Sequence, residues 1–438
     1  MSKNRILAAV LLCVSAHNLT AHEITMDVPE ILSRVASCNA DVKSAQSRHD
    51  AEQQGVSVAR SARLPQLSAS LQLNYLGDGT ILDRNFSNAI RDRLPHFGNT
   101  LNVTLYQPVY HGGAIAAGID LAKLKSELAA IGVEQSVDAA SIEALSCYFS
   151  LMKMSNLRKV YVDNIAITQR LIGQMTDHYN QGTALRNDIT RYRLRLSSLD
   201  YDLQCIDNSI SVNNCNLISL LGLEDTAVIV PATEIREDNI ILKDEAYWQE
   251  LTAAHSSELK AIDKSKSIAR TGLRLDRAAM LPKVGIVVGD QFTGPITFEI
   301  PAVNKNYNAW YAGVSISYDI SSLWTANKKM RQRRFEIANI ADQRIAVSEA
   351  LKRKVHEAYI AAVQARQMLD TETLNVQLAN ENYTVVETRF QNEMALLTDM
   401  LDASSAKLDA ETRLVNAKVN LILSYYQLKF ISGTLSEY

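Results

Sequence analysis

Few residues of this chain have the types and spacing that chemistry requires. The 8 His residues are scattered, without metal-ligand spacing, and neither a phosphate-binding glycine loop nor a nucleophile motif occurs. The acidic residues that stand out are Asp399 and Asp402, which lie three apart and therefore share one face of a helix. We therefore predict no enzyme activity, no cofactor and no metal.

The elements that position these acids occur twice. Asp188 and Asp399 are 211 residues apart, and so are Leu101 and Ala312, which begin corresponding strands. Each copy contains a strand pair and then a long helical stretch that is broken once, near residue 181 in the first copy and near 393 in the second. Repeats of this length restrict the architecture strongly. We predict a mostly α protein with a small β part, built from two internal repeats.

Composition narrows the class of protein. The chain has 45 basic and 48 acidic residues, a net charge of -3, which argues against a nucleic-acid partner. Only 8 Pro and 17 Gly occur in 438 residues, which favours long helices. Lys3 and Arg5 precede an apolar run at 6–14, which predicts a secretory signal peptide. Cleavage would follow Ala16 or Ala21, and Ala21 is favoured, so we assign residues 1–21 to the signal peptide. Beyond it, no apolar run has the roughly 18 residues of a membrane helix.

Export implies an oxidising compartment, in which disulfides persist. Cys147 lies 34 residues before residue 181 and Cys215 lies 34 after it. The two would therefore be level on antiparallel helices, which allows a Cys147–Cys215 disulfide if the Cα atoms come within about 7 Å. Two buried free thiols at a helix interface fit the same positions.

Four segments alternate apolar and polar residues as strands do: 66–75, 101–105, 284–288 and 311–320. Alternation over about 10 residues is typical of transmembrane barrels, but the strands of a soluble sandwich alternate equally well. The smallest membrane barrels have about 8 strands. Four strands therefore close a barrel only if several chains contribute. The intervening segments 76–100 and 293–308 read as turns.

Long helices should follow each strand pair. Residues 114–177 are predicted to form one helix or two in line. In the second repeat, Leu401 and Leu408 begin a run of apolar residues spaced by seven, which indicates that this helix packs as a coiled coil against neighbours on two sides. Asn213, Asn214 and Ser404 interrupt the apolar stripes. These polar residues either set the register or face water inside a tube.

Four motifs, in order, carry a resemblance to a known family. They are Leu-Pro-Gln-Leu at 64–67, Gln-Pro-Val-Tyr-His-Gly-Gly at 107–113, Tyr-Asn-Gln-Gly at 179–182 followed by Asp188, and Ser-Gly-Thr-Leu at 432–435. Together they resemble the TolC-like outer membrane efflux proteins over nearly all of the mature chain.

The resemblance implies a homotrimer in the bacterial outer membrane with a large periplasmic part. Long antiparallel coiled-coil hairpins would form an α-barrel, and four strands per chain would join into one 12-stranded transmembrane β-barrel. The first repeat would cover 22–225, an equatorial segment 226–256 and the second repeat 257–438. Expected partners are outer membrane lipid, a periplasmic adaptor and an inner membrane pump or ABC exporter.

The same resemblance assigns roles at the helical tips. Asp399 and Asp402 would line a narrow periplasmic entrance, where a ring of carboxylates favours cations. Acids in a helix's first turn also stabilise its dipole, which accounts well for Asp188, reasonably for Asp399 and poorly for Asp402. The tip residues would dock the adaptor; they are Gly182, Thr183, Ala184, Glu393, Met394 and Ala395.

Two departures from the family fall at the second tip. Ala395 stands where well-known members have an Arg that ties the entrance shut, and Glu393 stands where Gly is usual. Glycine accepts a positive φ and Glu does not, so Asn392 is expected to take that conformation. The function implied is an exit duct for tripartite efflux or type I secretion. The alternative is a periplasmic coiled-coil scaffold or adaptor with a soluble β domain.

Overall fold

The computed structural model describes residues 22–232, 240–299, 301–392 and 394–435. The predicted signal peptide and Glu393 lie outside this part of the chain. The described residues divide into two compact units, one of residues up to Lys43 with Val137–Thr252 and the segment from Lys354 onward, the other of Ser44–Ser136 with Ala253–Arg353. The division cuts through two long helices, so each repeat contributes to both units.

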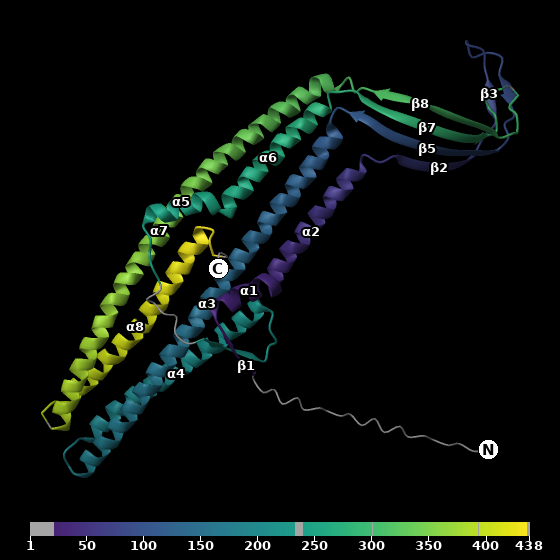
Figure 1. Cartoon of the computed structure of the whole chain (residues 1–438). Coiled ribbons are helices and arrows are strands. Elements are labelled where there is room, and N and C mark those ends of the chain that lie inside the picture. Colours follow the sequence, from purple (N-terminus) through teal and green to yellow (C-terminus); the bar gives the residue numbers. More distant parts are fainter. Residues whose placement is uncertain (1–21, 233–239, 300, 393, 436–438) are drawn as a thin grey trace, which may run out of the picture. The chain divides into compact units, whose positions relative to one another are not determined.

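One antiparallel sheet contains all four predicted strands, in the order β2-β5-β7-β8. These are β2 (Gln66–Tyr75), β5 (Phe97–His111), β7 (Lys283–Gly294) and β8 (Tyr307–Ser317), as Figure 1 shows. The strands form one sheet and not two packed sheets, so the soluble-sandwich interpretation is wrong. The segment 76–100, predicted to be turns, contains a short hairpin of β3 (Gly79–Ile81) and β4 (Ile90–Asp92).

The last strand ends earlier than the alternation predicted. Ser317 is the last residue of β8 and pairs with Lys283. Two residues on, Asp319 accepts hydrogen bonds from the backbone N–H and the hydroxyl of Ser321, at 3.0 and 2.6 Å. The chain has by then begun the turn into the next helix, so residues 318–320 continue the apolar pattern without a partner strand.

Register places like residues on one face of the sheet. Leu71 pairs with Leu101, which pairs with Phe292, and paired residues point to the same side. On the other face, a Cβ added to Gly285 or Gly289 would overlap the ring of Tyr106 or Tyr311 from a neighbouring strand. These two glycines make room for the tyrosine rings.

In both repeats, one helix precedes the strand pair in the sequence and two long helices follow it. In the first repeat, α2 (Ala40–Ser61) precedes the strands, and α3 (Ala114–Asn180) and α4 (Arg186–Leu221) follow them. In the second, α6 (Ser257–Ala278) precedes them, and α7 (Ser322–Gln391) and α8 (Leu397–Ile431) follow. The segment predicted as one helix or two is the single helix α3. No helix within the described ranges is both long and apolar enough to cross a membrane.

The first unit has the larger core. Besides parts of the long helices, this unit contains four shorter elements: strand β1 (His22–Met26), helix α1 (Val28–Cys38), strand β6 (Ala227–Pro231) and helix α5 (Glu245–His255). Fully buried Leu145, Phe149, Leu217 and Leu421 meet in one cluster. The four cysteines in the described ranges are free, so no Cys147–Cys215 disulfide forms. Cys147 is half-buried against this cluster and Cys215 is exposed, so the two do not share an environment.

The polar residues that interrupt the stripes have different roles. The side-chain amide of Asn214 on α4 makes two hydrogen bonds to the backbone of β6. Its Nδ2 donates to the Ala227 carbonyl at 3.0 Å, and its Oδ1 accepts from the Ile229 N–H at 2.8 Å. Neighbouring Asn213 bonds only to the Ser209 carbonyl of its own helix. The hydroxyl of Ser404 is buried and lacks a hydrogen-bond partner among the described residues. Asn214 therefore fixes strand β6 against α4.

We predict that Asn214→Ala lowers the free energy of unfolding by about 1–3 kcal/mol, because it leaves a buried carbonyl and N–H without a partner. Urea unfolding followed by circular dichroism measures the loss. Asn213→Ala is the matched control and should change stability by less than about 0.5 kcal/mol. Equal losses from the two variants would contradict the role given to Asn214.

Candidate functional site

The candidate site is the end of the first unit where the two helical hairpins turn, α3 into α4 and α7 into α8. The turns are built alike. At the first, the Thr183 N–H donates to the His178 carbonyl at 2.9 Å. At the second, the Met394 N–H donates to the Arg389 carbonyl at 2.8 Å. Both pairs differ by the 211-residue repeat offset. The duplication predicted from the sequence therefore extends to individual hydrogen bonds.

The conformation of the turns differs from one expectation. Gly182 has φ +79°, as a helix-ending glycine should. Asn392 does not have a positive φ, so the prediction that it replaces the missing glycine is wrong. Its N–H instead donates to the Thr388 carbonyl at 3.2 Å and continues the helical pattern.

Asp188 and Asp399 cap the return helices. The Leu185 N–H donates to Asp188 Oδ2 at 3.0 Å, and the Leu396 N–H donates to Asp399 Oδ2 at the same distance. Each carboxylate satisfies a backbone donor at the start of its helix, where negative charge is also favoured by the dipole. Both acids lie in the first turn of their helix, where the dipole interpretation places them, and the capping hydrogen bonds are an additional role.

Asp402 has no such role. It is exposed, and the described residues give it neither a hydrogen-bond nor an ion-pair partner. Met400 and Ala403 are buried, which turns Asp399 and Asp402 to an adjoining, exposed face of α8. The structure thus brings the two carboxylates to one exposed face next to the turn.

Two exposed leucines at the turns were not among the residues predicted from the sequence. Leu185 and Leu396 are the N-cap residues of α4 and α8, and each is 70% exposed. Leucine is strongly disfavoured at an N-cap. Their place immediately before a helix, at the same offset in both repeats, was the signal that could have identified them. Beside them, Gly182, Thr183 and Met394 are exposed, and Ala184 and Ala395 are half-buried.

An apolar cluster below the turns joins all four helices. It contains Leu171 and Met175 of α3, Ile189 and Tyr192 of α4, Tyr383 of α7, and Met400 and Ala403 of α8. Met400 is 0% exposed and Tyr192 is 1% exposed. Burial raises the pKa of the Tyr192 phenol, and its hydroxyl lacks a hydrogen-bond partner within the described ranges.

Polar contacts also join the α3–α4 hairpin to the α7–α8 hairpin. Glu387 on α7 lies 3.9 Å from Arg170 on α3 and accepts a hydrogen bond from the Tyr383 hydroxyl at 3.3 Å. Lys407 on α8 lies 4.8 Å from the centre of the Tyr383 ring. Burial, with the nearby Glu387 charge, raises the pKa of Tyr383 to about 12. Half-exposed ion pairs contribute about 0–1 kcal/mol, so the apolar cluster dominates.

Within the described residues, the chain thus has one sheet with an unpaired outer edge at β2 and at β8, and two long helical hairpins, the second of which carries exposed Asp399 and Asp402. The chain belongs to the outer membrane efflux protein family, whose pattern it matches over residues 31–223 and 248–434. Within the described residues, no three His, Cys, Asp or Glu side chains are grouped as a metal site would require.

Relatives support the assignment along the whole chain. The chain is 22% identical to the proteases secretion protein PrtF of Dickeya chrysanthemi, covering 100% of this chain and 94% of PrtF. It is 22% identical to the outer membrane protein TolC of Vibrio cholerae, covering 94% of this chain and 91% of TolC. The protein is therefore an outer membrane exit duct for efflux or secretion.

Solved structures share the fold. The outer-membrane channel OprN aligns with a TM-score of 0.75 at 14% identity, over 93% of this chain and 90% of OprN. The outer membrane protein VceC of Vibrio cholerae aligns with a TM-score of 0.72 at 15% identity, over 93% of this chain and 96% of VceC.

We predict that Met400→Ala lowers the free energy of unfolding by about 2–5 kcal/mol, because it leaves a cavity in the cluster. Glu387→Ala should cost less than about 1 kcal/mol, and Tyr192→Phe should be neutral or stabilising because the removed hydroxyl is unpaired. Urea unfolding of the purified protein gives all three values. A larger loss from Glu387→Ala than from Met400→Ala would show that ionic contacts, and not packing, join the hairpins.

Proposed function

We propose that three chains join their sheets edge to edge into one 12-stranded barrel in the outer membrane, and that their helices enclose a periplasmic tunnel. The observation that carries this proposal is the single sheet, whose strands β2 and β8 are each paired along one edge only within the described residues. The four strands alternate in direction. β2 and β8 are therefore antiparallel to each other, as strands meeting between two copies must be in an even, closed barrel.

Exposure of the sheet supports the membrane setting. Leu67, Leu71, Val314 and Ile316 on the edge strands are 71%, 65%, 66% and 70% exposed. Side chains of this kind on one face are stable against lipid tails, and the alternate Ser, Gln and Asn residues suit a wet lumen. Passage through such a lumen needs no catalytic group, so we assign no enzyme activity.

The chain would consist of two repeats joined by one intervening segment. Residues 22–225 and 257–438 would be two repeats of one wall, and 226–256 would form part of a belt around the tunnel. The two separate matches to the family pattern support this division, because the gap between them, 224–247, falls within or beside the proposed belt.

The gate would be at the helical turns. Asp399 and Asp402 from three chains would make a ring of six carboxylates, which favours cations over anions. Asp188, which has the same capping bond in the first repeat, would contribute to it less directly. With Ala395 in place of the family's Arg, the closed state would depend on the apolar cluster around Met400 and on the Arg170–Glu387 contact.

The turns would also dock a periplasmic adaptor. The proposed docking surface consists of Gly182, Thr183, Ala184 and Leu185 at one turn and Glu393, Met394, Ala395 and Leu396 at the other. Exposed Leu185, Leu396 and Met394 give it an apolar character that fits a protein partner. Through the adaptor, the duct would serve an inner membrane pump or an ABC exporter, and the PrtF relative supports type I secretion among these systems.

We predict that Asp399→Asn with Asp402→Asn lowers the cation selectivity of the channel in planar bilayers, because the charge of the ring is removed. The asparagine oxygen at 399 can still accept the Leu396 N–H, so the cap is largely retained. Asp188→Asn is the matched control and should leave the selectivity closer to that of the native channel.

The same preparation tests the whole proposal. It requires outer membrane fractionation, a trimer band that dissociates on heating, and conductance in planar bilayers. A soluble periplasmic protein without conductance would instead be the scaffold or adaptor. Unchanged selectivity in the double variant of a conducting trimer would eliminate the carboxylate ring alone.

We predict that Leu185→Ser with Leu396→Ser abolishes efflux or secretion in cells while leaving trimer formation and conductance intact. The reason is that both side chains are exposed and contribute to docking, not to the fold. Efflux assays with a matched Val162→Ser variant, which changes an exposed apolar residue away from the turns, provide the control. Full activity of the double variant would place docking elsewhere.

A further inference from the structure

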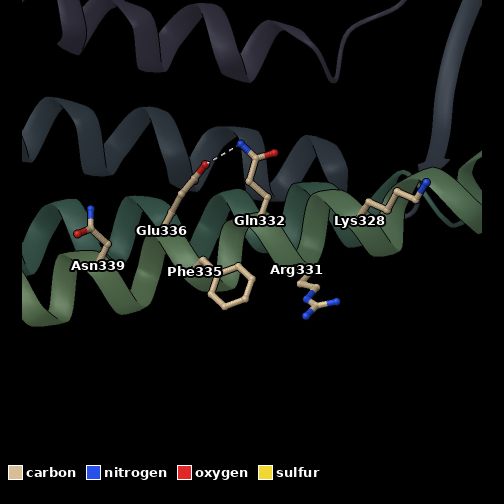
Figure 2. Close-up of a pocket in the computed structure, with 6 residues that line it drawn as sticks. All are labelled: Lys328, Arg331, Gln332, Phe335, Glu336 and Asn339. Carbon is tan, nitrogen blue, oxygen red and sulfur yellow. Dashed lines mark hydrogen bonds between the residues drawn. The ribbon is translucent and has the colours of Figure 1, made fainter.

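Two hollows in the described part of the chain are lined by both cationic and aromatic side chains. The first has a volume of about 550 Å³ and lies against Lys328, Arg331 and Phe335. Figure 2 shows that all of its labelled lining residues come from one helix, α7. A ligand site encloses most of its ligand, and one helix provides only one wall, so this hollow is a poor site for a small molecule.

The second hollow has walls from three segments of the first unit. Its volume is about 380 Å³, at the small end of the range for ligand pockets. Its lining residues are Ile241 and Lys243 before α5, Tyr247, Trp248 and Leu251 on α5, Tyr425 and Lys429 on α8, and Thr434 after α8. None of these side chains is acidic. A hollow of this size and composition suits one small molecule.

Aromatic side chains form the apolar part of the second hollow. Trp248 is 3% exposed and packs on Val355 and Leu428, which are fully buried. The rings of Tyr247 and Tyr425 meet the Trp248 ring edge to face, with centres 5.4 and 6.3 Å away. Tyr247 is 45% exposed and Tyr425 is half-buried, so parts of both rings remain open to a ligand. A planar ring packs well against such side chains.

The turn after α8 holds one wall of the hollow in place. Gly433 has φ +72°, the conformation in which helices commonly end. The Thr434 N–H then donates to the Lys429 carbonyl at 3.0 Å, and the Thr434 hydroxyl lies 2.8 Å from that of Ser432. The Ser-Gly-Thr-Leu motif at 432–435 thus fixes Thr434 beside the last turn of α8. This wall is therefore formed before any ligand binds.

Two lysines give the hollow its charge. Lys243 is exposed, and the described residues give it no ion-pair partner. Asp244, the next residue, accepts a hydrogen bond from the Tyr247 N–H at 3.4 Å at the start of α5. Lys429 is half-buried, with its Nζ 5.6 Å from the centre of the Tyr425 ring. Two ammonium groups in a lining without acids favour an anion.

The hollow also adjoins a hydrogen-bond donor that is not satisfied. The Trp248 Nε1–H is buried and has no acceptor within the described residues. Buried polar groups are normally paired. An oxygen atom of a bound ligand would be a suitable acceptor.

We propose that this hollow binds a small aromatic carboxylate, with its ring against Tyr247 and Tyr425 and its carboxylate at Lys243 and Lys429. A carboxylate has two oxygen atoms, so it can accept hydrogen bonds from both ammonium groups. The ligand would connect α5 to the end of α8. One chain supplies every lining residue, so this inference does not depend on the trimer proposed above.

The fluorescence of Trp248 tests the proposal in the purified full-length protein. Trp310→Phe with Trp324→Phe leaves Trp248 as the sole tryptophan of the chain. The probe is para-nitrobenzoate, whose nitroaromatic ring quenches tryptophan. Quenching should saturate, and the uncharged analogue para-nitrobenzamide should bind roughly ten-fold more weakly, because it lacks the charge that the lysines recognise.

Substitution of the lysines provides the matched comparison. In the same background, Lys243→Gln with Lys429→Gln should weaken binding of para-nitrobenzoate roughly ten-fold. Lys159→Gln changes an exposed lysine that does not line the hollow and should leave binding unchanged. Equal binding of the acid and the amide, quenching that does not saturate, or full affinity in the double lysine variant would overturn the inference.

A second measurement uses the native chain without substitutions. A water-soluble acetylating reagent modifies lysines, and mass spectrometry gives the rate at each of them. Saturating benzoate should slow acetylation of Lys243 and Lys429 several-fold, whereas benzamide should not, and Lys159 is the internal control. Equal rates with and without benzoate would overturn the inference. Neither measurement depends on conductance or secretion, so a negative result would leave the proposed duct standing.

Discussion

The open edges of the four-stranded sheet are the constraint on which the rest of the structure depends. A backbone N–H or C=O without a partner is expensive in an apolar medium, and an exposed strand edge in water invites aggregation. β2 and β8 are long, and almost all of their side chains are exposed on both faces of the sheet. Short strands, a covering helix or a bulge would protect such edges. Among the pairings of the described strands of this sheet, the irregularity lies between β5 and β7 near Pro108, away from β2 and β8. In the proposed trimer, the next chain would continue each of these edges.

The helical hairpins answer a different requirement. Their stability comes mainly from buried apolar residues, in the core around Phe149 and Leu421 and in the smaller cluster around Met400. Ion pairs such as Lys264–Glu127 and Arg274–Asp120 join α6 to α3 at 2.6 and 3.0 Å, but both pairs are substantially exposed. Such exposed pairs contribute only about 0–1 kcal/mol each. The same division of roles is found next to the turns, where the gate would open and close.

Much of this could be predicted from the sequence because periodicity and duplication are local signals. Alternation located β2 at its observed bounds, and the repeat offset placed the two turns and their capping acids. Features that depend on tertiary contacts were out of reach. The hydrogen bonds of Asn214 involve a strand 13 and 15 residues further along the chain. The end of β8 is set by the turn at Asp319, and the separate surroundings of Cys147 and Cys215 depend on helix rotation, which equal spacing from a turn does not determine.

The described residues of the two turns share several hydrogen bonds at equivalent positions. Thr183 and Met394 donate to equivalent carbonyls, and Leu185 and Leu396 are equally exposed. If the turns dock an adaptor as proposed, each polypeptide would offer it two similar sites, and an assembly of n chains would offer about 2n. A partner ring could then have twice as many subunits as the duct and still meet similar surfaces throughout. The residual differences between the turns, Glu393 and Ala395 among them, would determine whether alternate subunits of that ring bind equally.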